Sequence, residues 1–115
     1  MKDWTTIRER FLKDDISVRL GGLAANLSRI KSFANNEKNK AVVESLIDES
    51  KHFIEWTARE TEIETAAILV ELQVALALWQ IQLDKVWLDT DQRKQLSDQS
   101  NIWSQQVLMA SGLLG

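Results

Sequence analysis

The 115-residue chain contains no cysteine and no proline, and it has only four glycines. Without cysteine, the chain has no disulfide, no thiolate nucleophile and no cysteine-ligated zinc or iron–sulfur centre. Without proline and with so little glycine, it lacks most of the residues that break helices or form the turns of β-rich folds. These absences predict a protein built from long helices.

Residues able to do chemistry are also scarce, since His52 is the only histidine. The serines have no histidine base near them in the sequence that would activate them as nucleophiles. The acidic residues Glu55, Glu60, Glu62 and Glu64 fit the bias toward acids in the first turn of a helix, where they complement the helix dipole. The sequence therefore predicts no enzyme, no catalytic residues and no bound cofactor.

The chain carries no obvious signal for secretion or for a membrane. Its first ten residues alternate charged and apolar side chains, without the continuous apolar segment of a secretory signal. The most apolar stretch, residues 66–83, is interrupted by Glu71, Gln73, Gln80 and Gln82, which leaves no run of about 18 to 20 apolar residues. We expect it to form a buried helix in a cytoplasmic protein that binds no membrane, with residues 1–115 forming one domain.

Charge is unevenly distributed along the chain. Residues 1–40 contain nine Lys or Arg against five Asp or Glu, whereas residues 41–88 contain three against nine. A nucleic-acid-binding protein usually has a denser basic patch, so no nucleic-acid partner is expected. Segregation of charge is compatible with solvated helix faces of opposite sign, with packing between the two segments, or with head-to-tail association.

Apolar residues recur at helical spacing in five segments. The expected helices run from residue 3 or 4 to 13, from 16 to 34, from 37 to 56, from 58 or 61 to 88, and from 90 until Gly112 frays the last one. Motifs with capping-box spacing at 57–60 and 61–64 mark the corner before the fourth helix. In the last helix the expected inward residues are Leu96, Trp103, Val107, Ala110 and Leu114. The prediction is an all-α fold, a four- to five-helix bundle around a central apolar helix.

The fourth of these segments is apolar on two sides. One set of helically spaced residues comprises Ile63, Ala66, Ala67, Val70, Val74, Ala77 and Ile81. A second set comprises Leu69, Leu72, Leu76, Trp79, Leu83 and Val86. Two apolar sides need cover from at least two directions. Either the other helices enclose this segment or a second subunit completes the cover.

Five tryptophans are unusual for so short a chain. Trp79 and Trp103 fall on apolar seams, so we expect them in the core. Trp4, Trp56 and Trp87 lie near the ends of expected helices, where large half-exposed aromatic side chains can anchor a partner or a second subunit. These three are candidate interaction residues.

Gly21 and Gly22 lie inside an expected helix, where each glycine costs about 1 kcal/mol relative to alanine. Close packing of another helix or a kink would explain them. A phosphate-binding loop is not expected, because the preceding strand and the Lys-Ser/Thr ending are missing. As a functional alternative, this notch is a candidate docking place for a partner helix.

Glu49 and His52 match the Glu-x-x-His half of a carboxylate-bridged di-iron site in a helical bundle. Such a site needs a second half with another histidine, which this chain lacks, so no metal is expected. Helical bundles that transfer phosphoryl groups present one exposed histidine, so phosphotransfer is a second possible role for His52, by analogy of fold. The purely structural interpretation is a histidine at the boundary between the core and the solvent.

Three segments carry a resemblance to a known group of proteins: residues 19–33 (RLGGLAANLSRIKSF), 44–46 (ESL) and 49–58 (ESKHFIEWTA). The chain resembles short uncharacterised helical proteins of cyanobacteria over roughly half its length. The resemblance implies a cytoplasmic stand-alone helical domain, and it implies no activity and no site residues.

The functional hypothesis is a non-enzymatic helical interaction or assembly domain that associates with itself as a homodimer or binds another helical protein. The alternatives are a signalling bundle that uses His52 for phosphotransfer and a helical carrier of a small ligand or metal. The abundance of apolar seam positions and the lack of a reactive residue set favour the first hypothesis.

Overall fold

The computed structural model describes residues 2–113 and contains no strand within them. Its helices are α1 (Trp4–Leu12), α2 (Ile16–Phe33), α3 (Lys40–Thr57), α4 (Ile63–Leu88) and α5 (Thr90–Ser111). Two short 3₁₀ turns, η1 (Glu37–Asn39) and η2 (Ala58–Glu60), precede and follow α3. The all-α fold with five helices is therefore confirmed, and the predicted helix boundaries are close to those observed.

Aspartates begin three of the helices. The Asp3 carboxylate accepts a hydrogen bond from the Thr6 amide, that of Asp15 from the Val18 amide, and that of Asp89 from the first-turn amides of α5. Each satisfies amides that have no partner within the helix. Short polar side chains before an apolar segment thus account for these boundaries.

The corner between α3 and α4 is where the sequence places it, but the expected capping boxes do not form. Neither Thr57 nor the residue before α4, Glu62, caps a helix with its side chain. Instead the chain turns through η2, and the Thr61 hydroxyl donates a hydrogen bond of 2.7 Å to the Ala58 carbonyl. The Thr-x-x-Glu spacing predicted the position of the break between the two helices correctly. It predicted the wrong hydrogen bonds at that break.

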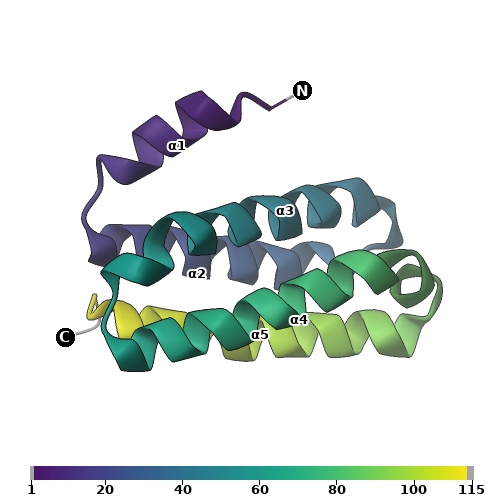
Figure 1. Cartoon of the computed structure of the whole chain (residues 1–115). Coiled ribbons are helices and arrows are strands. Elements are labelled where there is room, and N and C mark those ends of the chain that lie inside the picture. The colour runs from purple at the N-terminus through teal and green to yellow at the C-terminus, as the bar shows by residue number, and fades with distance from the viewer. Residues whose placement is uncertain (1, 114–115) are drawn as a thin grey trace.

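Four helices form a bundle in which each packs against two neighbours (Figure 1). α2 packs against α3 and α5, and α4 also packs against α3 and α5. α1 lies outside this bundle, over α3 (Figure 1). α4 therefore occupies one corner of the bundle, and a corner helix has neighbours on only part of its circumference.

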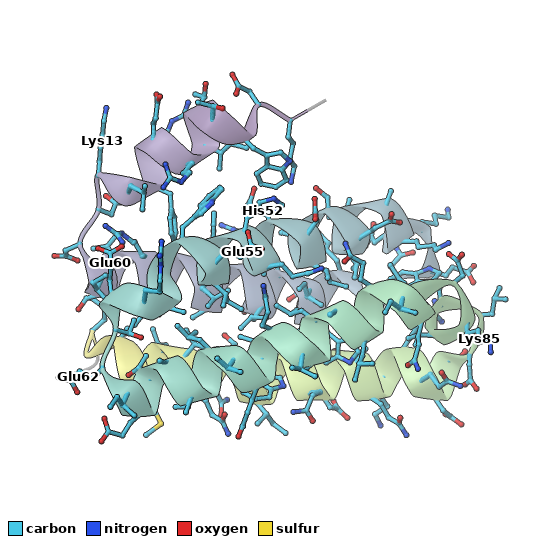
Figure 2. The ribbon with its side chains drawn as sticks, in the orientation of Figure 1. Lys13, His52, Glu55, Glu60, Glu62 and Lys85 are labelled. Atoms are coloured by element: carbon cyan, nitrogen blue, oxygen red, sulfur yellow. The ribbon has the colours of Figure 1, made fainter. Side chains whose placement is uncertain are left out.

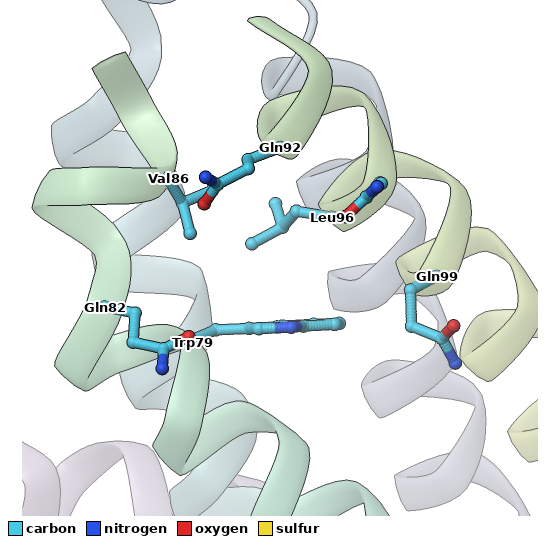
Figure 3. A pocket seen from close by; sticks show the side chains of 7 residues that line it. Trp79, Gln82, Val86, Gln92, Leu96 and Gln99 are labelled. Atoms are coloured by element: carbon cyan, nitrogen blue, oxygen red, sulfur yellow. The ribbon is translucent and has the colours of Figure 1, made fainter. Parts of the chain in front are cut away.

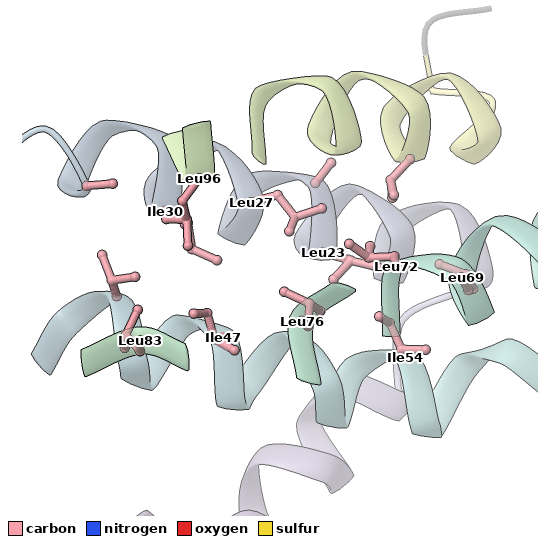
Figure 4. Close-up of a cluster of buried hydrophobic side chains, with 14 of the residues drawn as sticks. Leu23, Leu27, Ile30, Ile47, Ile54, Leu69, Leu72, Leu76, Leu83 and Leu96 are labelled. Carbon is pink, nitrogen blue, oxygen red and sulfur yellow. The ribbon is translucent and has the colours of Figure 1, made fainter. Parts of the chain in front are cut away.

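The core lies between the four bundle helices (Figure 4). Leucine and isoleucine side chains from α2, α3, α4 and α5 meet there, and several of them are fully buried. The buried residues drawn and labelled in Figure 4 are Leu23, Leu27, Ile30, Ile47, Ile54, Leu69, Leu72, Leu76, Leu83 and Leu96. Burying each such side chain contributes about 1.5 to 3 kcal/mol, so this cluster is the main source of the stability of the bundle.

The inward face of α5 differs from the expected one. Ser97, Ser100 and Ser104 are buried, and the hydroxyls of Ser97 and Ser104 each donate a 2.8 Å hydrogen bond to a carbonyl of α2. These small side chains let α5 pack closely on α2. Leu96 and Val107 are buried as predicted, while Trp103 is only partly buried and Ala110 is half-buried. Leu114 lies outside the described residues.

The oppositely charged segments of the sequence form ion pairs with each other within the folded chain. Three ion pairs join the basic first segment to the acidic middle segment: Lys2–Glu49, Arg19–Glu60 and Lys40–Asp84. The Lys40–Asp84 contact raises the pKa of the Lys40 ammonium, because it stabilises the charged form. Packing between the two segments is thus one use of their opposite charge.

Candidate interaction surface

α4 has one side in the core and the opposite side in solvent. Leu69, Leu72 and Leu76 are completely buried. On the opposite side, Ile63 is 85% exposed, Val74 56% and Ile81 80%. The exposed residues on this side are Ile63, Ala67, Val70, Val74, Leu78, Ile81 and Leu88, and we call them the α4 apolar face.

The members of the α4 apolar face recur every three, four or seven residues, which aligns them along one side of a helix. The expectation that other helices of the chain cover both apolar sides is wrong, because α3 and α5 cover only the side that contains the leucines. Of the two alternatives drawn from the sequence, enclosure within one chain fails. Cover from a second subunit remains open.

α4 is also the one helix in the described part of the chain that is long and apolar enough to cross a membrane, judged by length and composition. Its most apolar window has a mean hydropathy of 1.6, and only 22% of that window is buried. The sequence predicted a buried helix here, and that prediction is wrong. The core helices of soluble proteins pass the same test, so this property by itself assigns no membrane.

Polar residues border the α4 apolar face on both edges. Glu64 and Glu71, both exposed, lie along one edge. Gln73 and Gln80 lie along the other, where Gln80 accepts a 2.7 Å hydrogen bond from the Lys51 ammonium of α3. The only charge in line with the face is that of Lys85, near its end.

The two ends of α4 differ in charge. Figure 2 shows Glu60 and Glu62 near its beginning and Lys85 near its end. Within residues 2–113, neither Glu64 nor Lys85 forms an ion pair. The beginning of the face is thus acidic, and at its end Lys85 stands beside Asp84, whose carboxylate pairs with Lys40.

A second cluster of large side chains joins α1 to α3. Trp4 stacks on His52 with ring centroids 3.8 Å apart, and Phe11 stacks on Phe53 with centroids 4.1 Å apart. The Trp56 indole meets Trp4 edge-on at 6.2 Å. The candidate anchors Trp4 and Trp56 are therefore both half-buried and engaged within the chain.

The third candidate anchor, Trp87, is buried, with only 8% of its surface exposed. Its indole N–H donates a 2.6 Å hydrogen bond to the Glu37 carbonyl, and the Arg93 guanidinium lies over its ring. The expectation of a half-exposed anchor at this position is wrong. Trp87 instead fastens the end of α4 to the η1 turn.

Gly21 and Gly22 lie within α2, which continues through them without a break. A Cβ atom at Gly21 would lie 2.8 Å from the Leu113 side chain, whereas one at Gly22 would meet nothing within 4 Å. Both glycines line an open cleft of about 560 Å³ together with Phe11 and Phe53. The end of the Leu113 side chain therefore occupies the space beside the first glycine, and the second faces the open cleft.

Glu49 and His52 point to different partners. The Glu49 carboxylate accepts a 3.0 Å hydrogen bond from the Asn26 amide of α2, and His52 lies under Trp4 with its Nδ1 atom 2.8 Å from the Asp48 carbonyl oxygen. The described residues contain no group of three His, Asp or Glu side chains arranged to hold a metal ion. The two residues are thus used in packing α3 against α2 and α1.

A shallow cavity of about 290 Å³ lies between α4 and α5 (Figure 3). Trp79 extends from α4 across its floor, between Gln82 and Gln99 (Figure 3). Its other lining residues are Val86, Gln92, Gln95 and Leu96. Neutral amides cannot act as general acids or bases at ordinary pH, so this cavity has no evident catalytic capacity.

Comparison with protein-family models, with curated proteins and with solved structures finds no match for this chain. Its function is therefore inferred from the residues and their geometry.

Sequence reasoning named most members of the α4 apolar face as seam residues but did not identify them as interaction residues. The signal was present in the pattern, because residues 63–88 have apolar residues on two sides and, apart from Lys85, charged residues only along narrow edges. In a four-helix bundle, each helix is covered by its neighbours only on the side that faces the core. A helix with two apolar sides then has one side left uncovered.

Proposed function

We propose that this chain is a cytoplasmic, non-enzymatic helical interaction domain that associates with itself through the α4 apolar face. The observation that carries the proposal is the exposure of six large apolar side chains on one side of one helix, each at least 50% exposed. They are Ile63, Val70, Val74, Leu78, Ile81 and Leu88. Contiguous apolar surface of this kind marks interaction sites, because its removal from water contributes about 25 cal/mol per Å².

The shape of the face suits another helix. Its members follow the three- and four-residue steps by which helices pack side by side. Ala67 and Val70 are small enough to let a second backbone approach closely. A second copy of this chain offers the same straight apolar face of the same length, with the same polar borders.

A membrane surface fits this face less well. Helices that lie in a membrane interface usually carry Lys and Arg along their polar edges, which attract anionic lipids. Here Glu64 and Glu71 border the face, and anionic lipids would repel them. Protein association is therefore favoured over membrane binding.

The alternative functions have weaker support. One face of the His52 ring is covered by Trp4, and its Nδ1 atom lies against a backbone carbonyl, which leaves less of the imidazole open to a phosphoryl donor. A ligand carrier would use the cleft beside Gly22 or the cavity above Trp79. The cavity has no charged lining residue, and in the cleft Arg29 and Glu49 are both already hydrogen-bonded to the Asn26 side chain.

Sedimentation velocity over a range of protein concentrations tests the proposal. We expect the wild-type chain to form dimers in the micromolar range and Val74→Lys to remain monomeric, because a buried ammonium without a partner is costly. Val42→Lys is the matched control, because Val42 is 42% exposed on α3, outside the face. It should dimerise like the wild type, and both variants should keep their helical circular dichroism.

A wild-type chain that stays monomeric at all concentrations would overturn the proposal. So would monomers that bind vesicles of phosphatidylcholine and phosphatidylglycerol through Val74, since the face would then be a membrane-binding surface. Equal weakening by Val74→Lys and Val42→Lys would place the interface elsewhere on the molecule.

A further inference from the structure

We infer that two copies of this chain pair their α4 helices in antiparallel orientation, with Val74 at the two-fold axis and Lys85 of each copy beside Glu64 of the other. This inference rests on the proposed function, since it describes how the α4 apolar face is covered. It adds the orientation and the register of the two helices, which are set by the ends of the face.

The apolar side chains define the possible registers. α4 has 26 residues and is therefore about 39 Å long. With Val74 opposite its own copy, Leu78 lies opposite Val70, and Ile81 lies opposite Ala67. Large side chains then oppose smaller ones along the pair, which allows the two helices to interdigitate.

Charge decides the orientation. Glu62 and Glu64 stand at the beginning of α4, and Lys85 stands at its end. In a parallel pair, the glutamates of the two copies would face each other at one end and the two lysines at the other. In an antiparallel pair, each Lys85 lies within a turn of Glu62 and Glu64 of the second copy, and the two-fold symmetry makes this contact twice.

Charge also selects among the antiparallel registers. A shift that places Val70 opposite Val74 preserves the apolar contacts but moves Lys85 past the beginning of α4 in the second copy, away from Glu64. The register centred on Val74 keeps Lys85 level with the first turn of the second α4. Lys85 is available for a partner, because within residues 2–113 its neighbour Asp84 pairs with Lys40 and Lys85 itself forms no ion pair.

Cross-linking measures the orientation directly, because the chain has no cysteine of its own. Single-cysteine variants Val74→Cys and Ile63→Cys are treated with a short bifunctional maleimide. We expect Val74→Cys to form covalent dimers rapidly. Ile63→Cys should not, because in the antiparallel pair the two Ile63 positions are about 33 Å apart at 1.5 Å per residue.

The outcomes separate this inference from the proposed function. If both cysteines cross-link within a dimer, the helices are parallel, and the inference is overturned while self-association stands. If the chain is monomeric by sedimentation and neither cysteine cross-links, self-association itself fails. A dimer that cross-links through neither position overturns the inferred register.

Charge reversal gives an independent test of the same geometry. Lys85→Glu should raise the dimer dissociation constant about three- to tenfold, because two symmetry-related attractions become repulsions. Adding Glu64→Lys to that variant should restore the wild-type value. Lys94→Glu, at an exposed position of α5, is the matched control and should have no effect. An unchanged dissociation constant for Lys85→Glu would overturn the inference, because in a parallel pair the substitution only replaces one contact between like charges by another.

Discussion

Trp4 of α1 lies flat against His52 of α3, with the ring planes 10° apart. Seven residues later on α1, Phe11 makes a second stack on Phe53, with planes 11° apart. These two stacks are the main attachment of a helix that lies outside the four-helix bundle. Because few other contacts hold α1, we expect it to open as a unit while the bundle stays folded.

Trp4→Ala tests this independence of α1. The substitution removes an aromatic stack worth about 0.5 to 1.5 kcal/mol together with half-buried apolar area. Amide hydrogen exchange in α1 should become more than tenfold faster, and exchange in α2 to α5 should change little. Arg8→Ala, at an exposed position of the same helix, is the control. Equal acceleration throughout the chain would show that α1 unfolds together with the bundle.

Arg19 ties the α1–α2 connection to η2, and its side chain is only 9% exposed. Its guanidinium donates hydrogen bonds to the carbonyls of Leu12 and Asp14 and to the Glu60 carboxylate. Arg19→Ala should lower the free energy of unfolding by about 2 to 3 kcal/mol, because it leaves backbone carbonyls without donors.

Glu60→Gln is the informative comparison, since the Glu60 side chain is 54% exposed and ion pairs with such exposed partners contribute little. It should cost less than about 1 kcal/mol, because Arg19 keeps both backbone acceptors. Urea unfolding of the two variants measures the difference. Equal losses would mean that the ion pair, and not the carbonyl contacts, accounts for the contribution of Arg19.

The helices could be predicted from the sequence because their signals are local. Asp15 precedes an apolar repeat and caps the helix that follows, and no other part of the chain is needed to recognise this. The buried serines of α5 could not be recognised in the same way. Ser104 is polar in a pattern of apolar residues, and it is buried because α2 offers the Ala24 carbonyl as an acceptor.

The candidate site was harder to predict from the sequence, because the exposure of a helix face depends on how many neighbouring helices pack against it. The pattern of residues 63–88 revealed two apolar sides, but nothing local indicates that Leu72 faces the core and Val74 faces solvent. Trp87 illustrates the converse. Its position near a helix end predicted exposure, and the distant η1 turn buries it by supplying the Glu37 carbonyl.

The Asp3 cap makes the start of α1 sensitive to acid. The Thr6 hydroxyl and the Thr6 amide donate to the Asp3 carboxylate and hold its pKa below the ordinary value of 3.8. A lowered pKa means that this contribution to stability is fully present above the unfolded-state value and is lost as the pH falls through the lowered one.

We therefore expect a ¹³C titration of the Asp3 carboxyl to give a midpoint below 3.8 and Thr6→Ala to move it part of the way back. The amide donor remains in this variant, so the return should be incomplete. Thr5→Ala, which removes no donor hydroxyl from Asp3, is the control. An unchanged midpoint in Thr6→Ala would show that the hydroxyl contributes nothing to the cap in solution.

The two adjacent glycines of α2 should respond differently to alanine. At Gly22 a Cβ atom meets nothing within 4 Å, and the helical backbone needs no glycine there. Gly22→Ala should therefore stabilise the chain by up to about 1 kcal/mol and raise Tm by about 3 to 6 °C in scanning calorimetry. Gly21→Ala should stabilise the chain less than Gly22→Ala does, because its Cβ atom would displace the Leu113 side chain. A Tm lowered by Gly22→Ala, and only at high protein concentration, would instead mean that another molecule docks at this position.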